Sequence, residues 1–216
     1  ELAIGEWFTE EGNSIISKQE VYLIDRGFTP LGNDRGMIKF QVLGLQNNSY
    51  QIKFSALNQT SANEIIIPKN ELYNYVHLSF DNNGELVFAE PPKNEWDLVF
   101  TQYTAKVTQI TTGIVEDYSV NGVLINKNGV EVALELLAPF EEIKFTDLEN
   151  YNFTIYRDAI GYEWKDFDFD NNSYSIADFH TYLIKSVEGN YFKLRFTSFV
   201  NAEGKRGYPS LEFGRF

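Results

Sequence analysis

Alternation between hydrophobic and polar residues at every second position is the dominant pattern along the chain. Near the C-terminal end, Phe192, Leu194 and Phe196 alternate with charged or hydroxyl-bearing residues. A period of two is typical of a β-strand with one buried face. A hydrophobic run at 182–187 precedes this segment, and a short loop containing Gly189 separates the two. Because glycine adopts the positive φ of tight turns at little cost, the two runs predict a β-hairpin.

The same pattern recurs from one end of the chain to the other. Further strands are predicted at residues 21–24, 37–45, 50–57, 64–67, 73–80, 85–89, 96–107, 123–126, 130–136 and 210–213. Residues 117–122 are expected to form a loop, and the best helix candidate, 140–151, is short and polar. The 18 Phe and 13 Tyr residues strengthen the assignment of strands, since aromatic side chains favour strands. The sequence therefore predicts an all-β protein with antiparallel sheets and very little helix.

The predicted hairpin at 37–45 and 50–57 resembles the C-terminal one. Residues 50–57 match residues 192–199 in residue type at every position, although only Phe54 and Phe196 are identical. Two interpretations are open: an internal duplication of a β unit, or two amphipathic hairpins that converged on one alternation. Residues 1–69 are accordingly expected to form an N-terminal β region, either a duplicated unit or an extension of the domain formed by residues 70–216.

Composition and charge narrow the classes of partner. The 216 residues carry a formal net charge of −13, which argues against nucleic acid as a partner because phosphates would be repelled. No apolar run approaches the roughly 20 residues that span a bilayer. The chain has no cysteine, which excludes disulfides and thiolate chemistry and would also fit the mature part of a bacterial lipoprotein whose lipid-bearing Cys lies upstream. Since the chain begins at Glu1 without a leader pattern, a leader is expected to have been removed.

A family resemblance rests on the order and spacing of several short motifs. Trp96-Asp97-Leu98-Val99-Phe100 opens one predicted strand, and Phe140-Glu141-Glu142-Ile143 follows in the middle of the chain. Ile160-Gly161 then precedes Trp164-Lys165, and the closing part holds Thr181-Tyr182-Leu183-Ile184-Lys185. Over roughly residues 70–216 the chain resembles the HmuY family of Bacteroidetes lipoproteins, which are surface or outer-membrane proteins that bind haem. The resemblance implies twisted antiparallel sheets, a lipid anchor in the outer membrane, export to the surface or periplasm, and an outer-membrane receptor as partner.

The implied function is non-enzymatic capture of haem or another porphyrin for iron acquisition, but the ligand pattern of the family is not matched. The position five residues after Trp164, where the best-known member has one histidine ligand, is Phe169. The region that would hold the other ligand, residues 126–142, contains neither His nor Met. The haem-ligand candidates are therefore the remaining His and Met residues of the chain, His77, His180 and Met37.

Two other kinds of site receive less support. Asp166, Asp168 and Asp170 alternate as at the start of a calcium loop, but Asn171 stands where such a loop has glycine. Alternatively, the alternation of Asp and Phe marks a strand that has one solvent-exposed face and leads into a turn. No cysteine and only two histidines are present, and no Gly-x-Ser-x-Gly elbow appears, so the sequence predicts no enzyme. The alternative function is a surface adhesion module that binds glycans or proteins and has lost the haem site.

Overall fold

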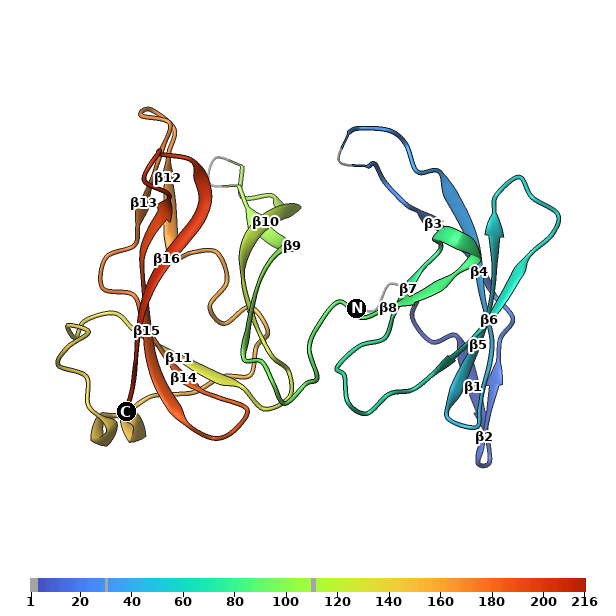
Figure 1. Ribbon diagram of the computed structural model, residues 1–216, viewed down its shortest axis with the longest axis horizontal. Coiled ribbons are helices and arrows are strands. Elements are labelled where there is room, and N and C mark those ends of the chain that lie inside the picture. The colour runs from blue at the N-terminus through green and yellow to red at the C-terminus, as the bar shows by residue number, and fades with distance from the viewer. Residues whose placement is uncertain (1–3, 30, 110–111) are drawn as a thin grey trace. The chain divides into compact units, whose positions relative to one another are not determined.

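The structure, a computed structural model, describes residues 4–29, 31–109 and 112–216 and divides them into two compact units (Figure 1). The first unit is Glu1–Glu90 and the second is Pro91–Phe216. Every ladder between the named strands is antiparallel. The prediction of an antiparallel all-β protein with very little helix is therefore confirmed.

The first unit is built around a four-stranded meander with two small hairpins. Its sheet has the strand order β3-β4-β5-β6, while β1 pairs with β2 and β7 pairs with β8. The elements are β1 (Phe8–Glu11), β2 (Ser14–Ser17), β3 (Val21–Asp25), β4 (Met37–Gln46), β5 (Ser49–Ala56), β6 (Asn63–Pro68), β7 (His77–Ser79), the 3-10 turn η1 (Asp81–Asn83) and β8 (Glu85–Val87).

The core of the first unit lies on one face of this meander. Phe40, Val42 and Ile52 are buried there, as the alternation of β4 and β5 requires. The segment after β6 returns to the same face, because Phe80 lies with its ring centroid 5.1 Å from that of Phe54. Gly84 follows with a φ of 97°, and a Cβ atom at this position would lie 2.7 Å from the Phe54 ring. Only glycine fits this close approach. The contacts of Phe80 and Gly84 with Phe54 show that the segment after β6 packs onto the core of the first unit.

This packing sets the division of the chain between Glu90 and Pro91, later than the boundary expected at residues 69 and 70. Leu78 and Leu86 pack against the first core, and both lie in the segment that was expected to belong to the C-terminal domain.

The second unit contains the remaining strands in four-stranded and two-stranded sheets. The larger sheet has the order β11-β14-β15-β16, while β9 pairs with β10 and β12 pairs with β13. The elements are β9 (Leu98–Thr108), β10 (Val115–Ile125), β11 (Glu131–Glu135), the 3-10 helix η2 (Phe145–Asn150), β12 (Lys165–Asp168), β13 (Ser173–Ile176), β14 (Thr181–Lys185), β15 (Tyr191–Val200) and β16 (Arg206–Arg215). The helix candidate at 140–151 is thus a short 3-10 helix.

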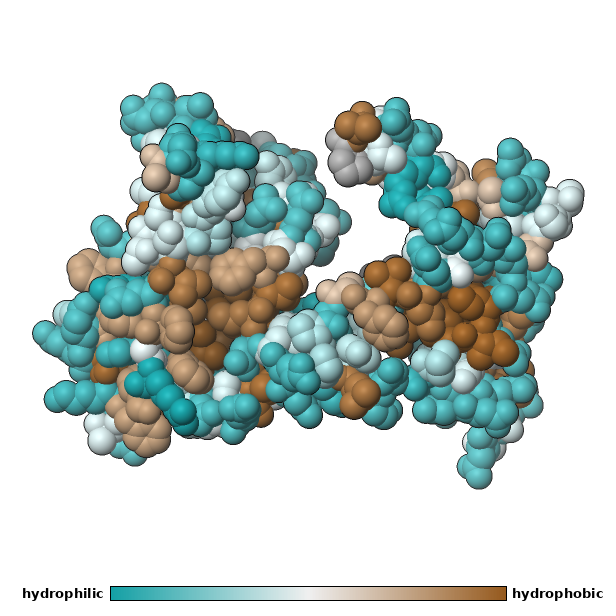
Figure 2. All heavy atoms as spheres, in the orientation of Figure 1, coloured by the Kyte–Doolittle hydropathy of each residue, from teal (hydrophilic) through white to brown (hydrophobic). Residues whose placement is uncertain are grey.

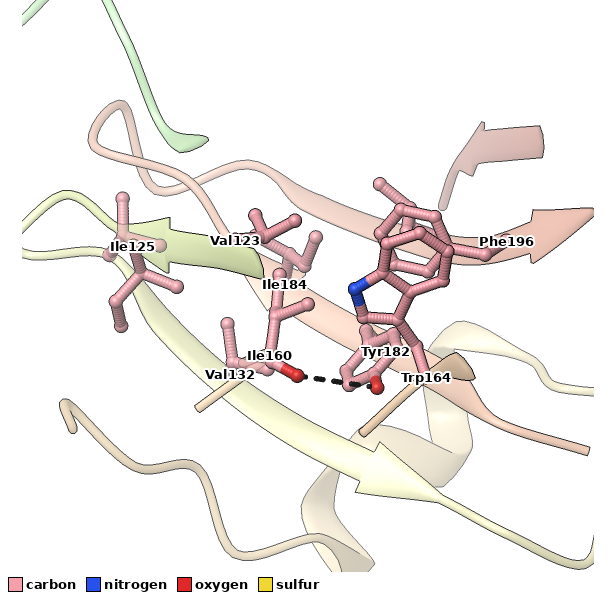
Figure 3. Close-up of a cluster of buried hydrophobic side chains, with 10 residues drawn as sticks. Val123, Ile125, Val132, Ile160, Trp164, Tyr182, Ile184 and Phe196 are labelled. Carbon is pink, nitrogen blue, oxygen red and sulfur yellow. Dashed lines mark hydrogen bonds between the residues drawn. The ribbon is translucent and has the colours of Figure 1, made fainter. Parts of the chain in front are cut away.

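An aromatic stack lies at the centre of the second core (Figure 3). The rings of Trp164 and Phe196 are stacked, with centroids 3.9 Å apart and an interplanar angle of 16°. Tyr182 lies next to them, and its hydroxyl donates a 3.4 Å hydrogen bond to the carbonyl oxygen of Ile160. The buried side chains of Val123 and Ile184 complete the cluster, so β10, β14, β15 and the segment before β12 share one core.

The motif at 96–100 links two distant parts of this unit. The Asp97 carboxylate accepts a 2.8 Å hydrogen bond from the backbone N–H of Val187, in the turn between β14 and β15. The Asp97 carbonyl oxygen accepts a second bond from the backbone N–H of Asn126, at the end of β10. A motif that marks the family resemblance therefore has a structural role.

The two similar hairpins each occupy the second and third strands of a four-stranded antiparallel sheet. Their turns differ. Asn47 and Asn48, with φ values of 49° and 59°, form a two-residue turn between β4 and β5, whereas five residues join β14 and β15. The pairing registers differ as well. Val42 is paired with Ile52 in the first hairpin, whereas Ile184 in the second is paired with Phe192 and not with Leu194, the residue that matches Ile52. Internal duplication stays a prediction.

Candidate functional site

His180 lies just before β14 and is half-buried. Its Nδ1 atom lies 3.2 Å from the carbonyl oxygen of Asp178. Because a carbonyl oxygen can only accept, this contact favours the tautomer that carries the proton on Nδ1. The lone pair on Nε2 is then free, which is the usual arrangement of a histidine that ligates a metal while its other nitrogen donates to the backbone.

The neighbouring residue has an unusual backbone conformation. Phe179 has a φ of 60°, in the left-handed region that side-chain-bearing residues rarely adopt. Its side chain is exposed. Local strain of this kind often accompanies a functional site.

A cleft of about 510 Å³ opens beside this histidine, entirely within the second unit. Three segments line it: the loop after β11, the segment that leads into β14, and part of β15. The lining residues are Ala138, Pro139, Phe140, Glu141, Ile176, Ala177, Asp178, Phe179, His180, Thr181, Arg195, Phe196 and Thr197. The cleft thus combines one imidazole with aromatic and aliphatic side chains, one guanidinium and two carboxylates.

Ionic and aromatic contacts hold the wall of the cleft formed by the loop after β11. Arg195 forms ion pairs of 2.8 Å with Glu141 and 2.7 Å with Glu212, and its guanidinium lies 4.5 Å from the centroid of the Phe140 ring. The hydrogen bond to Glu212 is the main cause that raises the pKa of Arg195. Lys193 donates hydrogen bonds of 2.6 Å and 3.1 Å to the carbonyl oxygens of Phe140 and Ile143. The loop is therefore fastened to β15.

The structure places the other two haem-ligand candidates in the first unit. His77 is exposed on β7, with its ring centroid 6.3 Å from that of Tyr75. Met37 is the first residue of β4 and is exposed. His77 and Met37 therefore belong to the first unit, whereas His180 belongs to the second.

The three aspartates of the calcium candidate surround the turn between β12 and β13, and all three are exposed. One oxygen of Asp168 accepts hydrogen bonds from the backbone N–H groups of Asp170 and Asn171, at 2.9 Å and 3.1 Å. The carboxylate therefore closes the turn. Within the described residues, no group of three His, Asp or Glu side chains is placed to hold a metal ion.

The two regions in which the family resemblance would place haem ligands differ in where they lie relative to the His180 cleft. Phe169 is 85% exposed at the end of the β12–β13 hairpin. The end of the region 126–142 does contribute to the His180 cleft, through Ala138 to Glu141. Arg195 and Glu141 were not identified as site residues from the sequence, because their contact with each other depends on the path of the loop after β11.

Comparison with known proteins gives one family. No curated protein matches the chain. The crystal structure of a protein from Bacteroides vulgatus, provisionally described as HmuY-like and haem-binding, is similar at 14% identity and a TM-score of 0.31, over 55% of this chain and 97% of that one. Since that score is low, the assignment rests on sequence: residues 45–213 match the family described as HmuY protein. The chain therefore belongs to the HmuY family.

Proposed function

We propose that the chain is a non-enzymatic binding protein that holds haem, or another porphyrin, in the cleft beside His180. Membership of the HmuY family supports this class of function. The observation that carries the proposal is the contact between His180 Nδ1 and the Asp178 carbonyl oxygen, which leaves Nε2 free to ligate iron.

The residues around the cleft fit a haem group. Phe179 supplies exposed aromatic surface for the ring, and a volume of about 510 Å³ falls in the usual range of ligand pockets, roughly 300–1,000 Å³. Arg195 is the cation for a propionate. The propionate would share this guanidinium with Glu141 and Glu212. Because Glu141 is exposed, water can solvate the Glu141 carboxylate when Arg195 turns to the propionate. When bound, haem supplies the iron centre, and the chain holds, orients and shields it.

A haemin titration tests this function. The purified chain should bind one haemin with a saturable shift of the Soret band. His180→Ala should weaken binding by about tenfold or more, since it removes the iron ligand. His77→Ala is the matched control, because His77 is the only other histidine of the chain and lies in the other unit; it should bind as the wild type does.

Two results would contradict the proposal. One is a titration that resembles free haemin mixed with an unrelated acidic protein. The other is a His180→Ala variant whose affinity and Soret band equal those of the wild type.

The proposed location is the outer membrane, where a lipid anchor outside this sequence would hold the chain on the surface or in the periplasm and an outer-membrane receptor would accept the haem. Family resemblance supports this location. Within the described residues no helix is both long and apolar enough to cross a bilayer. Cells of the source organism grown with an alkyne fatty acid should yield a labelled protein in the outer-membrane fraction; an unlabelled protein confined to the cytosol would contradict the location.

Adhesion to glycans or proteins is the second candidate. Tyr118 on β10 and Tyr208 on β16 are exposed, and such side chains can stack on a sugar ring. All three tryptophans, in contrast, are buried or half-buried: Trp7, Trp96 and Trp164. Adhesion therefore becomes the preferred function only if the haemin titration shows no specific binding.

A further inference from the structure

The first unit contains a larger pocket than the His180 cleft, with a volume of about 660 Å³. Its floor is the buried face of the meander, where Phe40, Val42, Ile52 and Ile67 lie. Figure 2 shows hydrophobic side chains gathered on this face of the first unit, around the sheet of β3–β6. The floor offers no polar side chain, so a ligand group that lies on it must be apolar to avoid losing its hydrogen bonds to water.

Aromatic side chains form the walls of this pocket. Trp7 and Tyr50 contact each other edge to face, with ring centroids 6.1 Å apart. Tyr73 lines the pocket from the segment after β6 and lies 5.3 Å from the ring of Phe88. These rings present large surfaces to a ligand, and the polar side chains of Asn70, Glu71 and Asn74 also contribute to the lining.

The mouth of the pocket carries a cation. Lys69 is exposed, and its ammonium lies 5.4 Å from the centroid of the Tyr50 ring. Its backbone N–H donates a 2.8 Å hydrogen bond to the carbonyl oxygen of Asn48, which fixes the backbone at this point. Across the described residues, no carboxylate lies within ion-pair distance of this ammonium. Glu71 is the other charged residue in the lining, and it is exposed.

We propose that this pocket binds an amphiphile with one carboxylate and a long apolar chain, such as a fatty acid. The chain lies on the hydrocarbon floor between the aromatic walls, and the carboxylate pairs with Lys69 at the mouth. A glycan fits less well, because its hydroxyl groups would lie against Phe40, Val42 and Ile52 without partners. This site is separate from the His180 cleft, since every residue that lines it belongs to the first unit.

Dodecanoate and dodecyltrimethylammonium test the charge preference on the full-length chain. The two probes share a chain length and carry opposite charges. Dodecanoate should bind with one-to-one saturation below its micelle concentration, and more tightly than the cation. Lys69→Met should weaken dodecanoate binding by about two- to fivefold, as expected for the loss of an ion pair with an exposed lysine.

Two variants serve as controls for this effect. Lys53→Met removes a lysine from β5 that pairs with Glu64 and does not line the pocket, so dodecanoate binding should not change. Glu71→Gln removes the carboxylate at the mouth and should bind dodecanoate at least as tightly as the wild type.

Tryptophan fluorescence locates the bound probe. Trp7 is the only tryptophan of the first unit, so 12-bromododecanoate should quench part of the emission, and Trp7→Phe should abolish that part. The proposal is overturned by an absence of saturable binding, by equal affinity for the two headgroups, by an unchanged Lys69→Met variant, or by binding that leaves Trp7 emission unquenched.

Discussion

Glu135 shows how single residues hold the loop that forms one wall of the His180 cleft. The carboxylate accepts hydrogen bonds from the Tyr151 hydroxyl and from the backbone N–H groups of Ala138 and Leu137. The bond from Tyr151, followed by those from Ala138 and Leu137, holds the pKa of Glu135 below its usual range. Since the folded pKa is lowered, this carboxylate stabilises the fold above its unfolded pKa, and the contribution is lost as pH falls through the folded pKa.

Replacement of this carboxylate should therefore have a pH-dependent effect. Glu135→Gln should lower the free energy of unfolding of the second unit by roughly 0.5–1 kcal/mol at pH 7, a small value because the side chain is half-exposed. The difference from the wild type should vanish only as pH falls through the lowered pKa of the folded Glu135 carboxyl, because the wild-type carboxyl is neutral below it. Urea unfolding at several pH values measures both.

Glu149→Gln is the matched control, because this exposed glutamate of η2 has the same charge and should have little effect on stability. A Glu135→Gln variant whose destabilisation stays constant from pH 7 down through the whole acid titration of the carboxyl groups would contradict a role for the charge.

Part of the candidate site could be predicted at the residue scale. His180 is a candidate from sequence simply because the chain has two histidines. Its contact with the Asp178 carbonyl oxygen and the positive φ of Phe179 are not encoded in a local pattern, since both depend on how the segment enters β14. Arg195 is one of the charged residues that alternate with Phe192, Leu194 and Phe196 in the sequence, but its pairing with Glu141 joins residues far apart in the chain.

At the scale of elements, alternation predicts strands where one face is buried and fails where neither face is. The sequence of β15 alternates clearly, and a strand was predicted there. β10 was expected to be partly loop at 117–122, yet it forms one strand from Val115 to Ile125 paired with β9. Its first five residues are all exposed, so no hydrophobic period marks them. Residues 73–80 show the opposite error: only His77–Ser79 form a strand, because the other hydrophobic residues there line the pocket and core of the first unit.

At the scale of the whole molecule, the two units have separate cores. The cluster around Phe40 and Phe54 draws all its members from the first unit, and the clusters around Trp164 and Leu183 draw theirs from the second. The two proposed ligands also divide in this way, with the haem cleft in one unit and the amphiphile pocket in the other. Damage to one core should therefore leave the other unit and its ligand unaffected.

Phe54→Ala tests this independence. The side chain is 3% exposed, so its removal should destabilise the first unit by about 3–5 kcal/mol. Hydrogen exchange followed by mass spectrometry should show faster exchange in peptides from β4 to β6 and unchanged exchange in those from β14 and β15. Dodecanoate binding should weaken, while haemin binding at His180 should not change. Leu183→Ala, in the core of the second unit, should produce the reverse pattern. If either substitution instead speeds exchange throughout the chain, the units fold as one cooperative body, and the two ligands would then be coupled through stability.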